Sequence, residues 1–113
     1  MKKFTLKFSV TEKEKVKFDD KEVTIPEMER RLLEDLLRFA RAGTKDINVA
    51  FDITDTITQI KSLTAKAVSI EISKEDIKWF MSGFQASANN PMRDMWFEKC
   101  GAILKQIRDF SKK

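Results

Sequence analysis

The sequence has no histidine and a single cysteine among its 113 residues, and these two shortages remove most of the familiar catalytic and metal-binding chemistry. Histidine is the commonest general base and a leading ligand of transition metals, and zinc sites that lack it need several thiolates. Zinc sites and nucleophilic machinery of the Ser-His or Cys-His type are therefore excluded. Cys100 cannot form a disulfide within the chain, which fits a reducing compartment. Its position between Trp96 and Ile103 predicts a packed, unreactive thiol.

Glycine, proline and long apolar runs are also scarce. The chain has 3 Gly and 2 Pro, too few to suggest a disordered linker. Its longest uninterrupted apolar run is far shorter than the roughly 20 residues that cross a bilayer, and no apolar segment follows the first residues as in a signal peptide. We therefore expect a soluble, cytoplasmic protein without a membrane partner, folded over residues 1–113 as a single α+β domain.

Alternating apolar and polar residues predict several β-strands, since successive side chains of a strand point to opposite faces. The first alternation is the clearest and places Phe4, Leu6, Phe8 and Val10 on one face. The polar run Asp19-Asp20-Lys21 is typical of a turn between two further alternations. The expected strands cover residues 4–10, 16–18, 23–25, 47–53 and 68–72. Together they predict an antiparallel sheet of four or five strands.

Apolar residues at spacings of three and four predict three or four helices that pack on this sheet. The expected helices cover residues 26–42, 55–66, 73–87 and 90–110. Pro26 and Pro91 suit a first helical turn, and Gly43 suits a helix end. Ser73 with Asp76 three residues later approximates a capping box. Residues 55–66 are rich in Thr and Ile, so a strand is an alternative there, and the last two helices would form a C-terminal hairpin.

This expected hairpin holds the densest group of aromatic and methionine residues in the chain. Its two consecutive triplets, Trp79-Phe80-Met81 and Met95-Trp96-Phe97, point to three sides of their helices at about 100° per residue. Either the sheet and the first helix enclose them all, or one member of each triplet is exposed for binding, with Trp79 and Phe97 the expected members. The candidate partner-binding residues are Trp79, Met81, Phe84, Met95, Trp96 and Phe97.

Lysines on the polar face of the first two strands offer an alternative function. They are Lys3, Lys7, Lys15 and Lys17. Pairing of these strands as neighbours would gather the lysines into one basic face, which either is simply solvated or contacts the phosphates of a nucleic acid. A net charge of +4 permits such a partner, but the chain has no Tyr and this face has no aromatic side chain to stack on a base.

An acidic grouping is the remaining candidate for a metal site. It consists of Asp46, Asp52, Asp55, Glu71 and Asp76. The spacing from Asp52 to Asp55 lacks the glycine and the terminal bidentate glutamate of a calcium loop. We therefore expect turn and helix-cap roles for these residues, and neither a metal nor a cofactor.

The run Val68-Ser69-Ile70-Glu71-Ile72-Ser73-Lys74-Glu75-Asp76-Ile77 resembles a pattern in small bacteriophage accessory proteins. In that pattern a lysine-rich helix precedes a short strand, a Ser-x-Glu-Asp/Glu-Ile helix start and a final apolar helix. The resemblance covers residues 55–107, although the two tryptophans of the hairpin depart from it. It implies a small non-catalytic protein of the host cytoplasm, either an assembly factor or a host-directed inhibitor of the anti-CRISPR type, and it identifies no functional residue.

The sequence as a whole predicts a non-enzymatic protein-binding module. Its expected binding surface is the C-terminal hairpin, and its expected partner is another protein or a second copy of the chain. Nucleic-acid binding through the lysine face is the alternative, and an enzyme would have to use carboxylates and lysines that show no recognisable arrangement.

Overall fold

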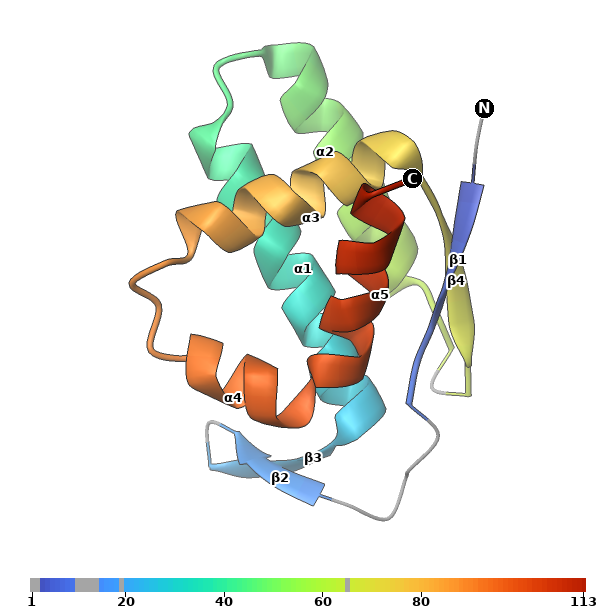
Figure 1. Ribbon diagram of the computed structural model, residues 1–113, viewed down its shortest axis with the longest axis vertical. Coiled ribbons are helices and arrows are strands. Elements are labelled where there is room, and N and C mark those ends of the chain that lie inside the picture. The colour runs from blue at the N-terminus through green and yellow to red at the C-terminus, as the bar shows by residue number, and fades with distance from the viewer. Residues whose placement is uncertain (1–2, 10–14, 19, 65) are drawn as a thin grey trace.

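The computed structural model describes residues 3–9, 15–18, 20–64 and 66–113, and within these ranges it has four strands and five helices (Figure 1). The strands are β1 (Lys3–Lys7), β2 (Lys15–Phe18), β3 (Lys21–Thr24) and β4 (Ser69–Ser73). The helices are α1 (Ile25–Gly43), α2 (Ile47–Lys61), α3 (Lys74–Ala86), α4 (Arg93–Lys99) and α5 (Gly101–Ser111). The α+β class is confirmed, while the expected strand residue Val10 and turn residue Asp19 lie outside the described residues.

Among the described residues the strands form two separate antiparallel ribbons of two strands each, so the expected sheet of four or five strands is wrong. The ribbon of β1 and β4 joins segments far apart in sequence and places Leu6 opposite Ile70. The ribbon of β2 and β3 is a local hairpin that places Val16 opposite Val23. In the turn of this hairpin Asp20 has a φ of 62°, a left-handed conformation that Asp accepts more readily than most residues.

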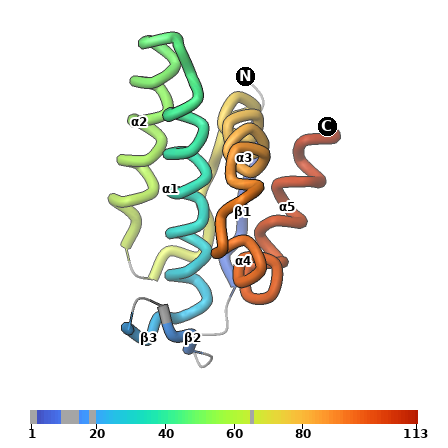
Figure 2. The backbone as a smooth tube through the Cα atoms, turned by 90° about the vertical axis from the view of Figure 1, so that its left-hand side faces the viewer, coloured from blue at the N-terminus to red at the C-terminus, as the bar shows by residue number. Residues whose placement is uncertain are grey.

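The core lies between the inner face of the β1–β4 ribbon and the helices. Its strand residues are Phe4, Leu6, Ile70 and Ile72, and its central helix residues are Leu32, Leu33, Leu36, Leu37, Ile77, Phe80, Ile103 and Ile107. Figure 2 shows α2 and α5 at opposite edges of the molecule, with α1 and α3 between them. In the part of the chain that the structure describes, no helix combines the length and the apolar character that a bilayer span requires.

Helix α1 is one residue longer at each end than the expected range 26–42, and the residues that begin and end it differ from those expected. Thr24 caps its start in a capping box with Glu27, and Pro26 lies in the first turn. The Thr-x-x-Glu pattern that signals this box is present in the sequence at Thr24 and Glu27. Gly43 is the last helical residue and has no positive φ, so it is not the left-handed terminator that its position suggested.

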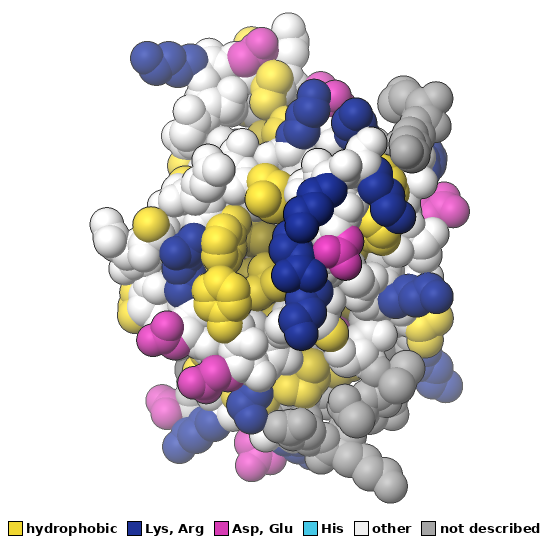
Figure 3. All heavy atoms as spheres, in the orientation of Figure 1, with side chains coloured by type: hydrophobic (Ala, Val, Ile, Leu, Met, Phe, Trp, Pro, Cys, Tyr) yellow, Lys and Arg dark blue, Asp and Glu magenta, His cyan; other side chains and the backbone are white. Residues whose placement is uncertain are grey.

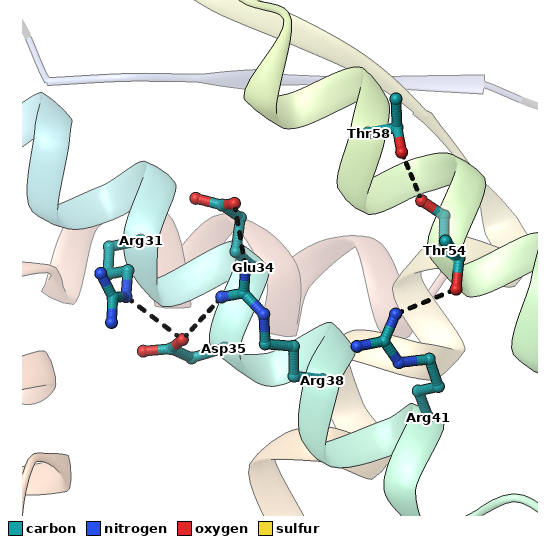
Figure 4. A network of polar contacts seen from close by, with 7 residues as sticks. All are labelled: Arg31, Glu34, Asp35, Arg38, Arg41, Thr54 and Thr58. Atoms are coloured by element: carbon teal, nitrogen blue, oxygen red, sulfur yellow. Dashed lines mark hydrogen bonds and ion pairs between the residues drawn. The ribbon is translucent and has the colours of Figure 1, made fainter.

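Charged side chains on α1 pair along the helix and reach across to α2 (Figure 4). Arg38 forms ion pairs with Glu34 and with Asp35 at 3.4 and 3.1 Å. Near the end of α1, Arg41 Nη1 donates to Thr54 Oγ1 of α2 at 3.0 Å. Ion pairs of this kind within one helix contribute about 0.3–0.5 kcal/mol each, and the Arg41–Thr54 hydrogen bond links α1 to α2.

The expected strand at residues 47–53 is wrong, because this segment is the first half of α2. Its apolar residues alternate as in a strand, but they belong to two different faces of a helix. Ile53 is buried, whereas Ile47 and Phe51 are 68% and 64% exposed. An apolar and polar alternation over so few residues is therefore not specific for a strand with one buried face.

An N-cap and hydroxyl hydrogen bonds satisfy the polar groups of α2, a segment rich in β-branched residues. Asp46 caps α2 by accepting from the backbone N–H of the second and third helical residues. The Thr54 and Thr58 hydroxyls donate to carbonyls one turn earlier, at 2.9 and 3.0 Å. The helix expected over residues 55–66 is confirmed as far as Lys61, where α2 ends.

The expected C-terminal hairpin of two helices contains three helices among the described residues (Figure 1). Ser73 and Asp76 form the expected capping box of α3. Asn90 Oδ1 accepts from the Met92 N–H at 2.8 Å and starts a helical turn that leads into α4. The expected single final helix breaks at Cys100, which has φ −117° and ψ 22°, and the chain then continues as α5.

Gly83 fixes the crossing of α1 and α3. A Cβ atom at this position would overlap the carbonyl oxygen of Leu36 and lie 2.6 Å from its carbonyl carbon. Only glycine therefore lets the two helix backbones approach this closely. This contact places the aromatic face of α3 beside α5, where the candidate site lies.

Candidate functional site

The structure separates the six candidate binding residues into core and surface. Trp96 is 3% exposed and belongs to the core, which removes it from the candidate surface. Phe97, the next residue, is 57% exposed, as expected. The half-buried members are Trp79, Met81, Phe84 and Met95. Trp96 and Phe97 are consecutive residues of α4 and point about 100° apart, so one triplet serves both the core and the surface.

Three of these residues, Met81, Phe84 and Phe97, line one apolar groove between α3, α4 and α5. The groove has a volume of about 360 Å³. Its other apolar lining residues are Leu36, Phe80, Leu104 and Ile107. Figure 3 shows apolar side chains gathered in this region, with basic side chains running along the α5 side. The structure thus brings half of the predicted binding residues together.

An aromatic pair forms one wall of the groove. The rings of Phe84 on α3 and Phe97 on α4 meet edge to face, with centroids 5.6 Å apart and an interplanar angle of 87°. The Arg93 guanidinium lies over the Phe84 ring at 3.9 Å, and its Nη2 donates to the Phe84 carbonyl at 2.9 Å. These contacts hold α4 against α3, and a fixed wall lowers the entropy that a ligand loses on binding.

The opposite wall comes from α5. Gly101, Leu104, Lys105 and Arg108 follow its groove side over about two helical turns. A Cβ atom at Gly101 would meet no atom within 4 Å, so the groove is open at this residue. Both charged residues among the described lining are basic, and the side chain of Arg108 is 57% exposed while pairing with Asp109 at 3.1 Å. This wall therefore favours an apolar ligand that carries negative charge.

The two remaining candidates lie away from the groove. Trp79 borders two shallower hollows on the α2 side of α3, one with apolar neighbours and one with acidic neighbours. Met95 is half-buried against the core and is absent from the described lining of the groove. The triplet containing Trp79 is therefore split between different faces of α3.

The expected basic face is wrong, because β1 and β2 do not pair with each other. The side chains of Lys3, Lys7, Lys15 and Lys17 are exposed, but they belong to two separate ribbons. Acidic residues also stand close to them. Glu71 borders the same hollow as Lys3, and Glu22 lies opposite Lys17 across the β2–β3 hairpin. Among the described residues, the pairing of these strands gives no continuous basic strip for a phosphate backbone.

The acidic grouping supplies helix caps, as expected for part of it. Asp46 caps α2 and Asp76 caps α3. The side chains of Asp52, Asp55 and Glu71 are exposed and border one shallow hollow. Across the described ranges, no three Asp, Glu or Cys residues are grouped as a metal site would require.

Cys100 is packed in the core, as expected, at the break between α4 and α5. Its exposed fraction is zero. Burial, with a smaller contribution from the Glu29 carboxylate, raises the pKa of the Cys100 thiol to about 12. The reactive thiolate is therefore scarce at neutral pH.

Glu29 is a buried carboxyl on α1 that is not among the candidate site residues. It is fully buried, and it accepts from the Ser9 backbone N–H at 2.7 Å and from the Ser9 hydroxyl at 2.8 Å. Burial raises the pKa of Glu29, while the two hydrogen bonds from Ser9 partly oppose this shift. A signal was available, since Glu29 lies three and four residues before Leu32 and Leu33 on the apolar stripe.

A second polar contact, between α5 and β1, had no signal in the sequence. The Gln106 side-chain amide donates to the Lys7 carbonyl and accepts from the Lys7 N–H, both at 2.8 Å. The amide thus copies the hydrogen bonds of a neighbouring strand at the open edge of β1. This contact fixes α5, and with it one wall of the groove, against the ribbon.

Comparisons of the chain with protein-family models, with curated proteins and with solved structures found no match. The resemblance to bacteriophage accessory proteins therefore stays a prediction. The chemistry of the groove itself has to indicate what it binds.

Proposed function

We propose that the protein is a non-catalytic binding module that holds an amphipathic helix of a protein partner in the groove between α3, α4 and α5. The observation that carries this proposal is an apolar groove whose charged lining residues, Lys105 and Arg108, are both basic. Concentrated apolar surface with a polar rim marks binding sites, and a helix in a groove is a recurring mode of peptide recognition. The partner helix should present apolar residues flanked by acidic ones.

The dimensions of the groove support a helical ligand. Its α5 wall extends from Gly101 to Arg108, which is about two helical turns or 10 Å. A ligand helix lying along this wall would place residues i, i+4 and i+7 in the groove, because these residues share one face. The apolar floor then receives the apolar face, and Lys105 and Arg108 meet acidic residues at its edge.

The chemical groups along the groove support a binding role rather than catalysis. Apart from Lys105, its described lining contains no side chain that could act as a base or nucleophile. An assembly factor or a host-directed inhibitor of the anti-CRISPR type, the two roles implied by the resemblance, would act through a protein-binding surface of this kind. With either role, the protein would act in the cytoplasm of the cell that the bacteriophage infects.

A groove-blocking variant tests the proposal. The probe is a labelled 15-residue helical peptide with Leu and Phe at i, i+4 and i+7 and with Glu beside them, titrated by fluorescence anisotropy. Gly101→Trp should weaken its binding at least about tenfold, because the new side chain fills the groove from a position with open space. The fold should survive, since the Cβ of the new side chain would meet no neighbouring atom.

The control is Gly43→Trp, a helical glycine outside the groove whose Cβ would also meet open space. This variant should bind the peptide like the wild type. Equal binding by the wild type and the Gly101→Trp variant, or a preference of the wild type for a peptide with Lys in place of Glu, would exclude the groove as the binding site.

A further inference from the structure

A second unpartnered apolar surface lies on the outer face of α2. Ile47 and Phe51 stand one helical turn apart and are 68% and 64% exposed. Asp55 continues the same line one turn later. Exposed apolar side chains one turn apart give a helix the face that helix-binding grooves receive.

The charge of this face complements the groove. The charged residues of α2 are the exposed Asp52 and Asp55 and, at its last position, the exposed Lys61. Residues 47–55, which span about the two helical turns of the groove, carry acidic charge alone. The charged residues described along the groove are Lys105 and Arg108. The outer face of α2 thus combines apolar and acidic residues, as the groove requires of its ligand.

The two surfaces face away from each other in one molecule. Figure 2 shows α2 and α5 at opposite edges, with α1 and α3 between them. Helix α2 also packs against α1 and α3 through its buried residues Ile53, Ile57 and Ile60. The outer face of α2 therefore cannot enter the groove of its own chain while the fold is intact.

We propose that α2 of one copy docks in the groove of a second copy. Ile47 and Phe51 would enter the apolar floor, and Asp52 and Asp55 would lie toward the basic α5 wall. This inference rests on the proposed function of the groove and names a second copy of the chain as its occupant. Because the two contacting surfaces differ, a pair of copies keeps one free groove at one end and one free α2 at the other, so the contact extends into open chains or closes into rings.

The proposal also has a consequence for foreign partners. One helix in one groove covers less surface than the roughly 800 Å² per partner of a standard interface, so the contact should be weak and should depend on protein concentration. A copy seated in the groove would compete with a partner helix. Dilution should therefore raise the fraction of grooves that are available to a partner.

Two complementary variants test the head-to-tail contact by sedimentation velocity. Wild-type protein should exceed the monomer mass of 13.2 kDa progressively as its concentration rises. Gly101→Trp blocks the groove and leaves α2 intact, whereas Phe51→Glu disables α2 and leaves the groove intact. Each variant alone should stay a monomer, and an equimolar mixture should give a particle of twice the monomer mass and nothing larger.

Val68→Glu is the control, because Val68 is 65% exposed and lies outside both surfaces. It should associate like the wild type, and thermal melts should show that all variants are folded. A wild-type protein that stays monomeric at every concentration would overturn the proposal, as would a mixture of the two variants that stays monomeric while the wild type associates. If the Glu-flanked peptide still binds in either case, the proposed function of the groove stands and only the second copy is ruled out as its occupant.

Discussion

Glu29 is the residue whose ionisation is coupled most directly to the folded state, because its carboxyl is fully buried and held by Ser9. Burial raises its pKa above the ordinary value of 4.5, so the folded chain binds this proton more tightly than the unfolded chain does. The free energy of unfolding should therefore fall as pH rises from about 4.5 through the pKa of the folded state. Above that window the full penalty of the buried charge is present.

Glu29→Gln should remove this part of the pH dependence. The amide can still accept from the Ser9 N–H and can donate to the Ser9 hydroxyl, while it carries no charge at any pH. Urea denaturation from pH 4 to pH 8 should show a stability difference that shifts in favour of the Gln variant as pH rises. Glu22→Gln, at an exposed site, should follow the wild-type profile. If the free energy of unfolding depended on pH in the same way for the wild type and for Glu29→Gln, burial of the Glu29 charge would carry no penalty.

The residues of the two aromatic triplets show what local sequence can and cannot decide. Helical geometry left open whether one core encloses both triplets or leaves Trp79 and Phe97 exposed; in the structure Phe97 is exposed and Trp79 is half-buried. This geometry could not indicate which residues the core would take, because that depends on how α4 packs against α1, where Trp96 lies beside Met28 and Leu32. Trp96 is therefore buried while its neighbour lines the groove.

At the scale of elements, helix caps were predictable and the state of α2 was not. Ser73 with Asp76 gave the start of α3, because a capping box is a contact within four residues. Helix α2 depends on Asp46 and on packing of Ile53, Ile57 and Ile60 against other helices, which overrides the strand preference of its β-branched residues. Because this packing depends on residues far away in the sequence, the helical state of α2 could not be predicted from the short segment alone.

The crossing of α1 and α3 should be sensitive to a single methyl group at Gly83. Gly83→Ala places a Cβ against the Leu36 carbonyl, so we expect a loss of about 1–3 kcal/mol in the free energy of unfolding although Ala favours helices. Gly101→Ala, where the Cβ would meet open space, should instead be neutral or stabilise by up to about 1 kcal/mol. Urea denaturation measures both, and a neutral Gly83→Ala would show that the helices separate at little cost.

At the scale of the whole molecule, strand partners and the groove depend on long-range contacts. Period-2 patterns located β1, β2, β3 and β4, but such a pattern carries no information about which strands pair. The expected sheet and its lysine face failed for this reason. The groove likewise combines residues of α1, α3, α4 and α5, so only some of its lining could be predicted from one dense stretch of sequence.

The distribution of charge over the molecule gives the last prediction. If Lys105 and Arg108 select acidic ligands, a variant carrying Lys105→Glu and Arg108→Glu should bind the Glu-flanked peptide about 2–30-fold more weakly, given 0.2–1 kcal/mol per exposed pair. It should also gain affinity for the Lys-flanked peptide, and both changes should shrink at high salt. The control carries Lys61→Glu and Lys74→Glu, which alter the net charge equally at exposed sites outside the groove. If both variants lose affinity equally, overall charge attracts the peptide and the groove wall does not select it.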